Sequence, residues 1–460
     1  MVKLPEVVNL ISGLVMADKK CYLVGGAVRD ALLGRDSQDV DVVCSCNARS
    51  IAKNVADHLK GSFYVLDAER NAFRVIAKEQ AGGRLVIDFS VQRGESIQDD
   101  LGLRDFTINA MAIDLTRLDE IIDPLHGARD LQEKWLRPCS RSSFEEDPLR
   151  VLRAIRYAVK YDLKIEEQTS RLLKQSVKKM QACSRERIRD ELFKILENPR
   201  PWTGFQLIEH FGIFDSVHLA GTQDRRKAVS RLRAMDLLLS TLEGTSTQET
   251  KESLAMASFL SGFWKNRTAM RDHVRQVNQS ERSLGALNKL AALLYDTQEP
   301  EFEEILERIV LSTDERDHLN LLHVNQTVFF DLASKGANPD DRAVYQYFGQ
   351  MGRSGLDLIL LSLAEAVNCV AVEFDEGKWL RLLQVGQKLV DTWFERPNVI
   401  RPELFLSGRD LMFEFDIPQG PLIGSLLEGL EEEQAAGTIR TRQGAVEWIE
   451  GKIQRGFITG

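Results

Sequence analysis

The spacing of apolar residues changes about a third of the way along this chain. In the first third, short apolar runs alternate with turns, as in a mixed α/β fold, and a helix is expected over residues 49–61. Runs typical of strands cover residues 21–26, 39–44, 71–79 and 84–90. From Phe144 onward the spacing is helical almost throughout, with breaks at residues 198–202, 334–341 and 396–403. The pattern predicts a small α/β head followed by a long all-helical body.

Length and composition bound the class of protein. A chain of 460 residues is too long for one hydrophobic core, so two to four domains are expected. Its apolar (43%) and charged (28%) fractions are those of an ordinary globular protein, and no apolar run is long enough to cross a bilayer. The six scattered cysteines form no metal-binding or disulfide pattern, which indicates reduced thiols in a cytoplasmic protein.

The first 20 residues could be mistaken for a signal peptide. They contain Glu6 and Asn9, and no small-residue cleavage site follows them. Their apolar residues fall on one helical face, namely Leu4, Val7, Val8, Ile11 and Val15. We therefore predict an amphipathic opening helix.

The net charge of −9 hides a local asymmetry. Between Arg150 and Arg200 there are 14 lysines and arginines against 7 acidic residues. Such a basic stretch is typical of a phosphate-binding surface, and a solvated helix face explains it equally well. The charge pattern alone leaves both interpretations open.

Asp39 and Asp41 stand two residues apart in an apolar strand, so they share one face while Val40 and Val42 face the other way. Two like charges side by side repel, and a bound cation relieves the repulsion. Mg²⁺ favours one or two carboxylates together with substrate phosphates, and it can activate an attacking hydroxyl. The pair alone is a weak signal, because an exposed edge strand would also tolerate it.

Two further features lie near this strand. Gly25 and Gly26 precede an expected helix, and a glycine turn of this kind exposes backbone N–H groups that bind phosphate; a plain tight turn is the alternative. Asp88 lies in the apolar run 84–90, where an unpaired acid would be unfavourable. We expect Asp88 either to join the metal site or to bind a neighbouring arginine.

The residues around Asp147 predict the beginning of a helix. Aspartate followed by Pro148 favours Asp147 as the N-cap and the proline as the first helical residue. Asp147 and Arg150 would then lie close together at the first turn, where they could recognise a base edge. A cap with a local salt bridge is the alternative.

Five motifs follow one another between residues 21 and 196. They are GGAVRD (25–30) with DVD (39–41), LRDFTINAMA (103–112), DPLHGARDL (123–131), EDPLR (146–150) with Arg153 and Arg156, and RERI…EL (185–192). Together they resemble the class II tRNA nucleotidyltransferase and bacterial poly(A) polymerase family, of the polymerase-β superfamily. The segment 418–424 resembles the tail of these enzymes more weakly.

The resemblance implies a template-independent transfer of CMP or AMP to the 3′ end of tRNA. It implies that Asp39 and Asp41 are catalytic and hold Mg²⁺. The nucleotide-binding residues that it implies are Gly26, Arg29, Arg104, Asp105, Asn109, Asp147, Arg150, Arg153 and Arg156. Among these, Asp147 and Arg150 would act as a protein template that selects CTP and ATP.

The same resemblance implies an architecture. An α/β head with a polymerase-β-like sheet would be followed by an all-α neck, body and tail. The expected boundaries are a catalytic head over 1–137, a neck that selects the nucleotide over 138–200, a body over 201–340 and a tRNA-binding tail over 341–460. The expected partners are tRNA, CTP and, as a second nucleotide, ATP, with no membrane.

Two departures from the family pattern affect the expected specificity. Leu103 stands where the second motif usually begins with an arginine. The segment from Asp88 to Asp100 is short, and family members that add all of C, C and A usually carry a longer loop there. We therefore expect a CC-adding enzyme that works with a separate A-adding enzyme, with full CCA addition or A addition as alternatives.

Other functions fit the sequence less well. A poly(A) polymerase usually has a basic segment after the catalytic strand, which residues 67–74 do not resemble. No histidine is followed by aspartate, so no His-Asp phosphohydrolase activity is expected. An inert RNA-binding protein would have no reason to keep the repulsive acid pair, and the long helical region disfavours a small-molecule nucleotidyltransferase.

Overall fold

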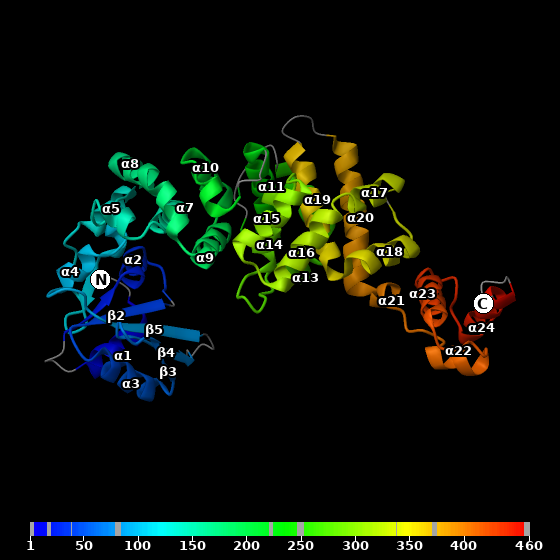
Figure 1. Ribbon diagram of the computed structural model, residues 1–460, viewed down its shortest axis with the longest axis horizontal. Helices are drawn as coiled ribbons and strands as arrows, with labels where there is room; N and C mark the ends of the chain where they lie inside the picture. Colours follow the sequence, from blue (N-terminus) through cyan, green and yellow to red (C-terminus); the bar gives the residue numbers. More distant parts are fainter. Residues whose placement is uncertain are drawn as a thin grey trace. The chain divides into compact units, whose positions relative to one another are not determined.

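The computed structural model describes residues 4–15, 20–37, 39–78, 84–219, 224–245, 253–336, 338–369 and 375–454. The chain divides into two compact units. The first contains residues 1–199 and 207–217, and the second contains residues 200–206 and 218–460. Figure 1 shows that the sheet belongs to the N-terminal part of the first unit. Among the described helices, none combines the length and the apolar character that crossing a bilayer requires.

A seven-stranded sheet forms the centre of the first unit, in the order β3-β4-β5-β2-β1-β6-β7. The strands are β1 (Cys21–Val24), β2 (Asp39–Cys44), β3 (Ser62–Asp67), β4 (Ala72–Lys78), β5 (Arg84–Val91), β6 (Ala112–Asp114) and β7 (Ile121–Ile122). Strands β2 and β5 run parallel, while β1 pairs antiparallel with β2. The four predicted strands are confirmed. The prediction missed β3, an edge strand with mostly exposed side chains, and the short β6 and β7.

Different helices pack against the two faces of the sheet. On one face, Val40 and Val42 join a core built with α1 (Glu6–Leu14) and α3 (Ala48–Leu59), so the predicted opening helix is confirmed. On the other face, Val43 packs with residues of α4 (Ile97–Gly102). Because side chains alternate along a strand, Asp39 and Asp41 lie on this second face.

The rest of the first unit is almost entirely helical. Its helices are α2 (Gly26–Leu32), η1 (Thr107–Asn109), α5 (Gly127–Glu133), α6 (Ser143–Glu146), α7 (Arg150–Tyr161), α8 (Glu167–Ser176), η2 (Val177–Ala182), α9 (Arg185–Leu196), η3 (Phe214–Val217) and part of α10 (Pro201–His210). The short strands β8 (Trp135–Leu136) and β9 (Lys164–Ile165) form a small second sheet. Five cysteines of this unit, Cys21, Cys44, Cys46, Cys139 and Cys183, are free thiols.

The prediction of a helix starting at Pro148 was wrong. Helix α7 begins at Arg150 with Leu149 as its N-cap, and Asp147 ends α6 instead. The Asp147 carboxylate still accepts a hydrogen bond, from the backbone N–H of Leu149 at 3.2 Å. The aspartate therefore stabilises the turn between two helices, and the helix itself starts two residues later than predicted.

The regular elements of the second unit, within its described residues, are all helices. Its helices are α11 (Arg225–Glu243), α12 (Ser253–Phe263), α13 (Arg267–Val274), α14 (Leu284–Leu294), α15 (Glu299–Ile309), α16 (Thr313–Val324), α17 (Val328–Lys335), α18 (Asp341–Met351), η4 (Gly352–Ser354), α19 (Gly355–Cys369), α20 (Glu376–Glu395), α21 (Pro397–Ile400), α22 (Gly408–Glu414), α23 (Pro421–Ala435) and α24 (Arg442–Gln454). The predicted breaks at 198–202, 334–341 and 396–403 fall at helix ends. Apolar residues of α22, α23 and α24 form a separate small core.

Candidate active site

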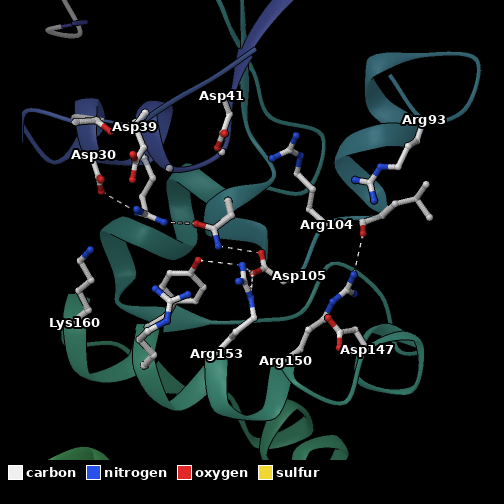
Figure 2. A pocket seen from close by; sticks show the side chains of 18 residues that line it. Asp30, Asp39, Asp41, Arg93, Arg104, Asp105, Asp147, Arg150, Arg153 and Lys160 are labelled. Carbon is white, nitrogen blue, oxygen red and sulfur yellow. Dashed lines mark hydrogen bonds and ion pairs between the residues drawn. The ribbon is translucent and has the colours of Figure 1, made fainter. Parts of the chain in front are cut away.

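Asp39 and Asp41 begin β2 and lie on the same side of the strand (Figure 2). In the parallel pairing of β2 with β5, Asp88 is the neighbour of Asp41. The Asp88 carboxylate accepts hydrogen bonds from Nε and Nη2 of Arg74, each at 2.8 Å. Of the two expectations for Asp88, the structure therefore realises the arginine pair, at a position next to the two acids.

The acid pair has the electrostatics of a cation site. Burial raises the pKa of Asp41 to about 6; Arg104 opposes the rise, and the charges of Asp88 and Asp39 add to it. A divalent cation between Asp39 and Asp41 would offset this repulsion. The described residues contain no cluster of three or more acidic, histidine or cysteine side chains that could hold a metal ion. Two carboxylates fit Mg²⁺, which takes its remaining ligands from phosphates and water.

Gly25 lets a guanidinium approach the acid pair. The residue has a φ of 71°, and a Cβ atom placed on it would lie 2.9 Å from Nη1 of Arg104 and 3.5 Å from Oδ2 of Asp41. Arg104 is held from the other side by Asp100, whose Oδ2 accepts from Nε and Nη2 at 3.2 Å. The absence of a side chain at residue 25 therefore makes room for a cation beside Asp41.

Arg29 is almost fully buried, with 4% of its surface exposed, yet it lines the same pocket. Its Nε donates to Asp30 at 3.0 Å, and its Nη1 donates to the side-chain oxygen of Asn109. Its guanidinium carbon lies 4.2 Å from the ring centre of Tyr161. These contacts fix the orientation of a buried positive charge.

Asp105 connects the head to α7. Its Oδ2 accepts from Nε and Nη2 of Arg153 at 2.9 and 2.5 Å, and its Oδ1 accepts from Nδ2 of Asn109 at 3.0 Å. Burial would raise the pKa of Asp105, but Arg153 and Asn109 outweigh burial and lower it. The carboxylate is thus an ionised anchor for Arg153 at the floor of the pocket.

Asp147 and Arg150 lie close together, as expected, since the backbone N–H of Arg150 donates to the Asp147 carbonyl at 3.0 Å, but their side chains bond to different partners. Asp147 accepts from Nη2 of Arg187, on α9, at 2.8 Å. Arg150 donates from Nη1 to the Ser143 hydroxyl at 2.6 Å and from Nη2 to the Leu103 carbonyl at 3.1 Å. Each side chain is therefore oriented separately, and the two can receive one base edge between them.

A carboxylate of the protein accepts a hydrogen bond from Arg156, as Asp105 does from Arg153. Its Nε donates to Oε2 of Glu191 at 2.7 Å, and its guanidinium lies 4.3 Å from the ring centre of Tyr157. Glu191 is 3% exposed. The protein therefore neutralises part of each guanidinium charge and fixes its direction.

All of these groups surround one cavity of about 470 Å³. The eleven site residues expected from the sequence all line it: Gly26, Arg29, Asp39, Asp41, Arg104, Asp105, Asn109, Asp147, Arg150, Arg153 and Arg156. Two acids thus face several fixed cations across a cavity large enough for a nucleotide. This combination suits metal-assisted chemistry on a phosphorylated substrate.

Comparison with known proteins agrees with this geometry. The poly(A) polymerase head domain matches residues 21–137, and the probable RNA- and SrmB-binding site of polymerase A matches residues 162–220. A CC-adding tRNA nucleotidyltransferase of Geobacter sulfurreducens is 31% identical over 94% of this chain and 91% of its own length. The chain belongs to the class II tRNA nucleotidyltransferase family.

Members of this family with different specificities resemble the chain. An A-adding tRNA nucleotidyltransferase of Deinococcus radiodurans is 28% identical over 93% of this chain and 94% of its own length. The structure of a CCA-adding enzyme in complex with ATP aligns with a TM-score of 0.65 and 24% identity, over 97% of this chain and 95% of that one. The predicted fold class, an α/β head followed by helical parts, is thereby confirmed. Class II tRNA nucleotidyltransferases use divalent metal ions.

The two departures from the family pattern have a structural counterpart. The Leu103 side chain is 42% exposed at the pocket, and its contribution to the polar network is a backbone carbonyl. Strand β5 and helix α4 are joined by residues 92–96 alone, so the connection between them is short, as the sequence predicts.

Several pocket residues were not predicted. They are Asp30, Ser37, Arg93, Leu103, Tyr157 and Lys160. Helical spacing could have identified Lys160, since it lies on the same face of α7 as Arg153 and Arg156. Arg93 lies in the connection 92–96, and its place depends on the path of that loop, which spacing does not reveal.

Proposed function

We propose that the chain is a CC-adding tRNA nucleotidyltransferase, which transfers CMP from CTP to the 3′ end of tRNA. The observation that carries the proposal is that the acid pair on β2 and the pair Asp147 and Arg150 line one cavity in a chain of this family. The acid pair would serve the chemistry, and Asp147 with Arg150 would select the base. Because tRNA would be the substrate, we place the reaction in the cytoplasm.

Asp39 and Asp41 would hold Mg²⁺. When bound, the metal lowers the pKa of the attacking 3′-hydroxyl and neutralises charge on the leaving pyrophosphate. Arg104, beside Asp41, adds a fixed positive charge toward the reacting phosphate. Arg153 and Arg156, with the backbone at Gly26 and the buried Arg29, would position the triphosphate and ribose, while Asp105 and Asn109 hold the arginines in place.

Asp147 and Arg150 would select the base. A carboxylate accepts hydrogen bonds and a guanidinium donates them, so together they can match the amino and carbonyl groups of cytosine. Their separate partners, Arg187 for Asp147 and Ser143 for Arg150, limit how far each can rotate. Selection by fixed groups of this kind needs no nucleic-acid template.

The preference for two cytidines rests on the connection between β5 and α4. With residues 92–96 alone between them, the chain lacks the longer loop on which a change from CTP to ATP would depend. The CC-adding activity of the Geobacter relative supports the same specificity. The A-adding Deinococcus relative is the reason to keep A addition as a second candidate. A separate enzyme would then complete the CCA end.

The basic residues between 150 and 200 that lie outside the pocket would bind the tRNA backbone through phosphates and shape rather than sequence. With the expected boundaries, the head (1–137) performs the chemistry and the neck (138–200) selects the nucleotide. The body (201–340) and tail (341–460) would extend the grip on tRNA.

Primer extension tests the proposal directly. Three tRNA transcripts, ending before CCA, after C and after CC, are incubated with Mg²⁺ and CTP, ATP or both. A CC-adding enzyme extends the first two to CC and never adds AMP to the third. Completion of CCA would show a full CCA-adding enzyme, extension of the CC-ended transcript alone would show an A-adding enzyme, and no extension at all would overturn the assignment.

A further inference from the structure

The cations that line the pocket differ in how they are held. Each of the arginines there donates to a carboxylate or a carbonyl of the protein: Arg29 to Asp30, Arg93 and Arg104 to Asp100, Arg150 to the Leu103 carbonyl, Arg153 to Asp105 and Arg156 to Glu191. Lys160 forms no hydrogen bond or ion pair with the part of the chain that the structure describes; its ammonium lies 5.5 Å from the ring centre of Tyr161. Its charge is available to a ligand.

The surroundings of Lys160 carry an excess of positive charge. Burial lowers the pKa of its ammonium; Asp30 opposes this, and the guanidinium groups of Arg29, Arg156 and Arg35 lower the pKa further. Asp30 is already engaged, since it accepts from Nε of Arg29 at 3.0 Å and from the Tyr161 hydroxyl at 3.1 Å. An anion beside Lys160 would relieve the repulsion among these cations.

The position of Lys160 along α7 indicates which anion this is. Lys160 follows Arg156 by four residues and so shares its face of the helix, and the ten residues from Arg150, at 1.5 Å each, place Lys160 about 15 Å farther along α7. In Figure 2 Lys160 lies at the opposite end of the pocket from Asp147 and Arg150. That separation is comparable with the length of an extended nucleoside triphosphate. A nucleotide whose base meets Asp147 and Arg150 would reach Lys160 with its terminal phosphates.

We propose that Lys160 binds the β- and γ-phosphates of the incoming nucleotide, the part that leaves as pyrophosphate. This inference rests on the proposed function, and it assigns the phosphate end of the same pocket. Because no hydrogen bond or ion pair from the described residues holds the ammonium, it can follow the phosphates as the bond to the α-phosphate breaks. The fixed arginines would set the nucleotide's orientation, and Lys160 would supply the recognition of a triphosphate over a monophosphate.

Equilibrium binding of CTP, CDP and CMP to the full chain with Mg²⁺ tests the proposal. In K160M, which keeps the apolar stem, CTP affinity should fall about tenfold while CMP affinity stays within about twofold, since one charge-assisted contact of this kind contributes about that factor. Lys160→Arg should retain most of the CTP affinity. K78A removes an equal charge from an exposed residue outside the pocket and should leave every nucleotide affinity unchanged.

The outcomes separate this inference from the proposed function. An unchanged ratio of CTP to CMP affinity in K160M, in a chain that still transfers CMP, would overturn the role of Lys160 alone. A raised KM for tRNA with that ratio unchanged would overturn it in favour of an RNA contact. If the unmodified chain neither binds CTP nor extends tRNA, the proposed function falls and this inference falls with it. Weaker inhibition by pyrophosphate in K160M would support the proposal a second way.

Discussion

Arg153 donates two hydrogen bonds, at 2.9 and 2.5 Å, to a single carboxylate oxygen of Asp105, a residue 48 positions earlier in the chain. Asp105 is 8% exposed, and the Arg153 side chain is 31% exposed. The bond joins the loop after α4 to the helix that carries half of the pocket's arginines. It therefore fixes the position of α7 relative to the catalytic strand.

Removing the charge of Asp105 should weaken both the fold and the site. In D105N, Arg153 loses its anion while its guanidinium stays partly buried, so the free energy of unfolding should fall by on the order of 2–3 kcal/mol. The value of kcat/KM for CTP should fall at least tenfold. Denaturant unfolding and steady-state kinetics measure the two effects. E167Q, which removes an acid from the exposed pair with Arg171, should change neither quantity.

On the proposed roles, in which the acid serves the chemistry and the basic helices hold the RNA, Asp39→Ala should abolish nucleotide transfer and leave tRNA binding intact. Transfer is followed by primer extension, and binding by filter retention of labelled tRNA at several salt concentrations. D57A removes an exposed acid on α3 and should affect neither. Transfer at the unmodified rate in D39A would contradict the role of the acid pair.

Asp41→Asn should stabilise the metal-free protein at neutral pH. The folded-state pKa of Asp41 is raised to about 6, so its ionisation above that pH costs stability. For the unmodified chain, the contribution of Asp41 is fully present below the unfolded pKa of about 4 and is lost as pH rises through about 6. Melting temperatures in EDTA should therefore be higher for D41N at pH 7 and converge near pH 4. A constant difference at all pH values would refute this explanation.

Gly25→Ala should reduce activity by at least tenfold. The new methyl group would press against Nη1 of Arg104 and displace it from Asp41, in addition to the strain of a φ of 71°. Gly34→Ala is the matched control, because Gly34 has a φ of 67° and open space around the added atom. Only G25A should lose activity. Equal activities would show that the approach of Arg104 to residue 25 does not matter.

The local spacing of apolar and charged residues was enough to predict much of the secondary structure. The alternation around Asp39 and Asp41 predicts a strand with two acids on one face, and Val40 and Val42 do pack on the other. The opening helix and the helix breaks followed from apolar spacing and from glycine and proline positions. The order of the motifs indicated the family. These features are readable because strands and helices repeat every 2.0 and 3.6 residues.

Only the tertiary structure showed which groups the charged side chains of the site bond to. Asp88 could have joined the metal site, but the register of β4 against β5 places Arg74 opposite it. Asp147 and Arg150 are three residues apart, yet α7 begins only at Arg150, and Asp147 binds Arg187 from α9. Arg153 and Arg156 bind Asp105 and Glu191, each more than 30 residues away. A charged side chain in a half-buried pocket takes its partner from whatever element packs against it, and that packing depends on the whole core rather than on neighbouring residues.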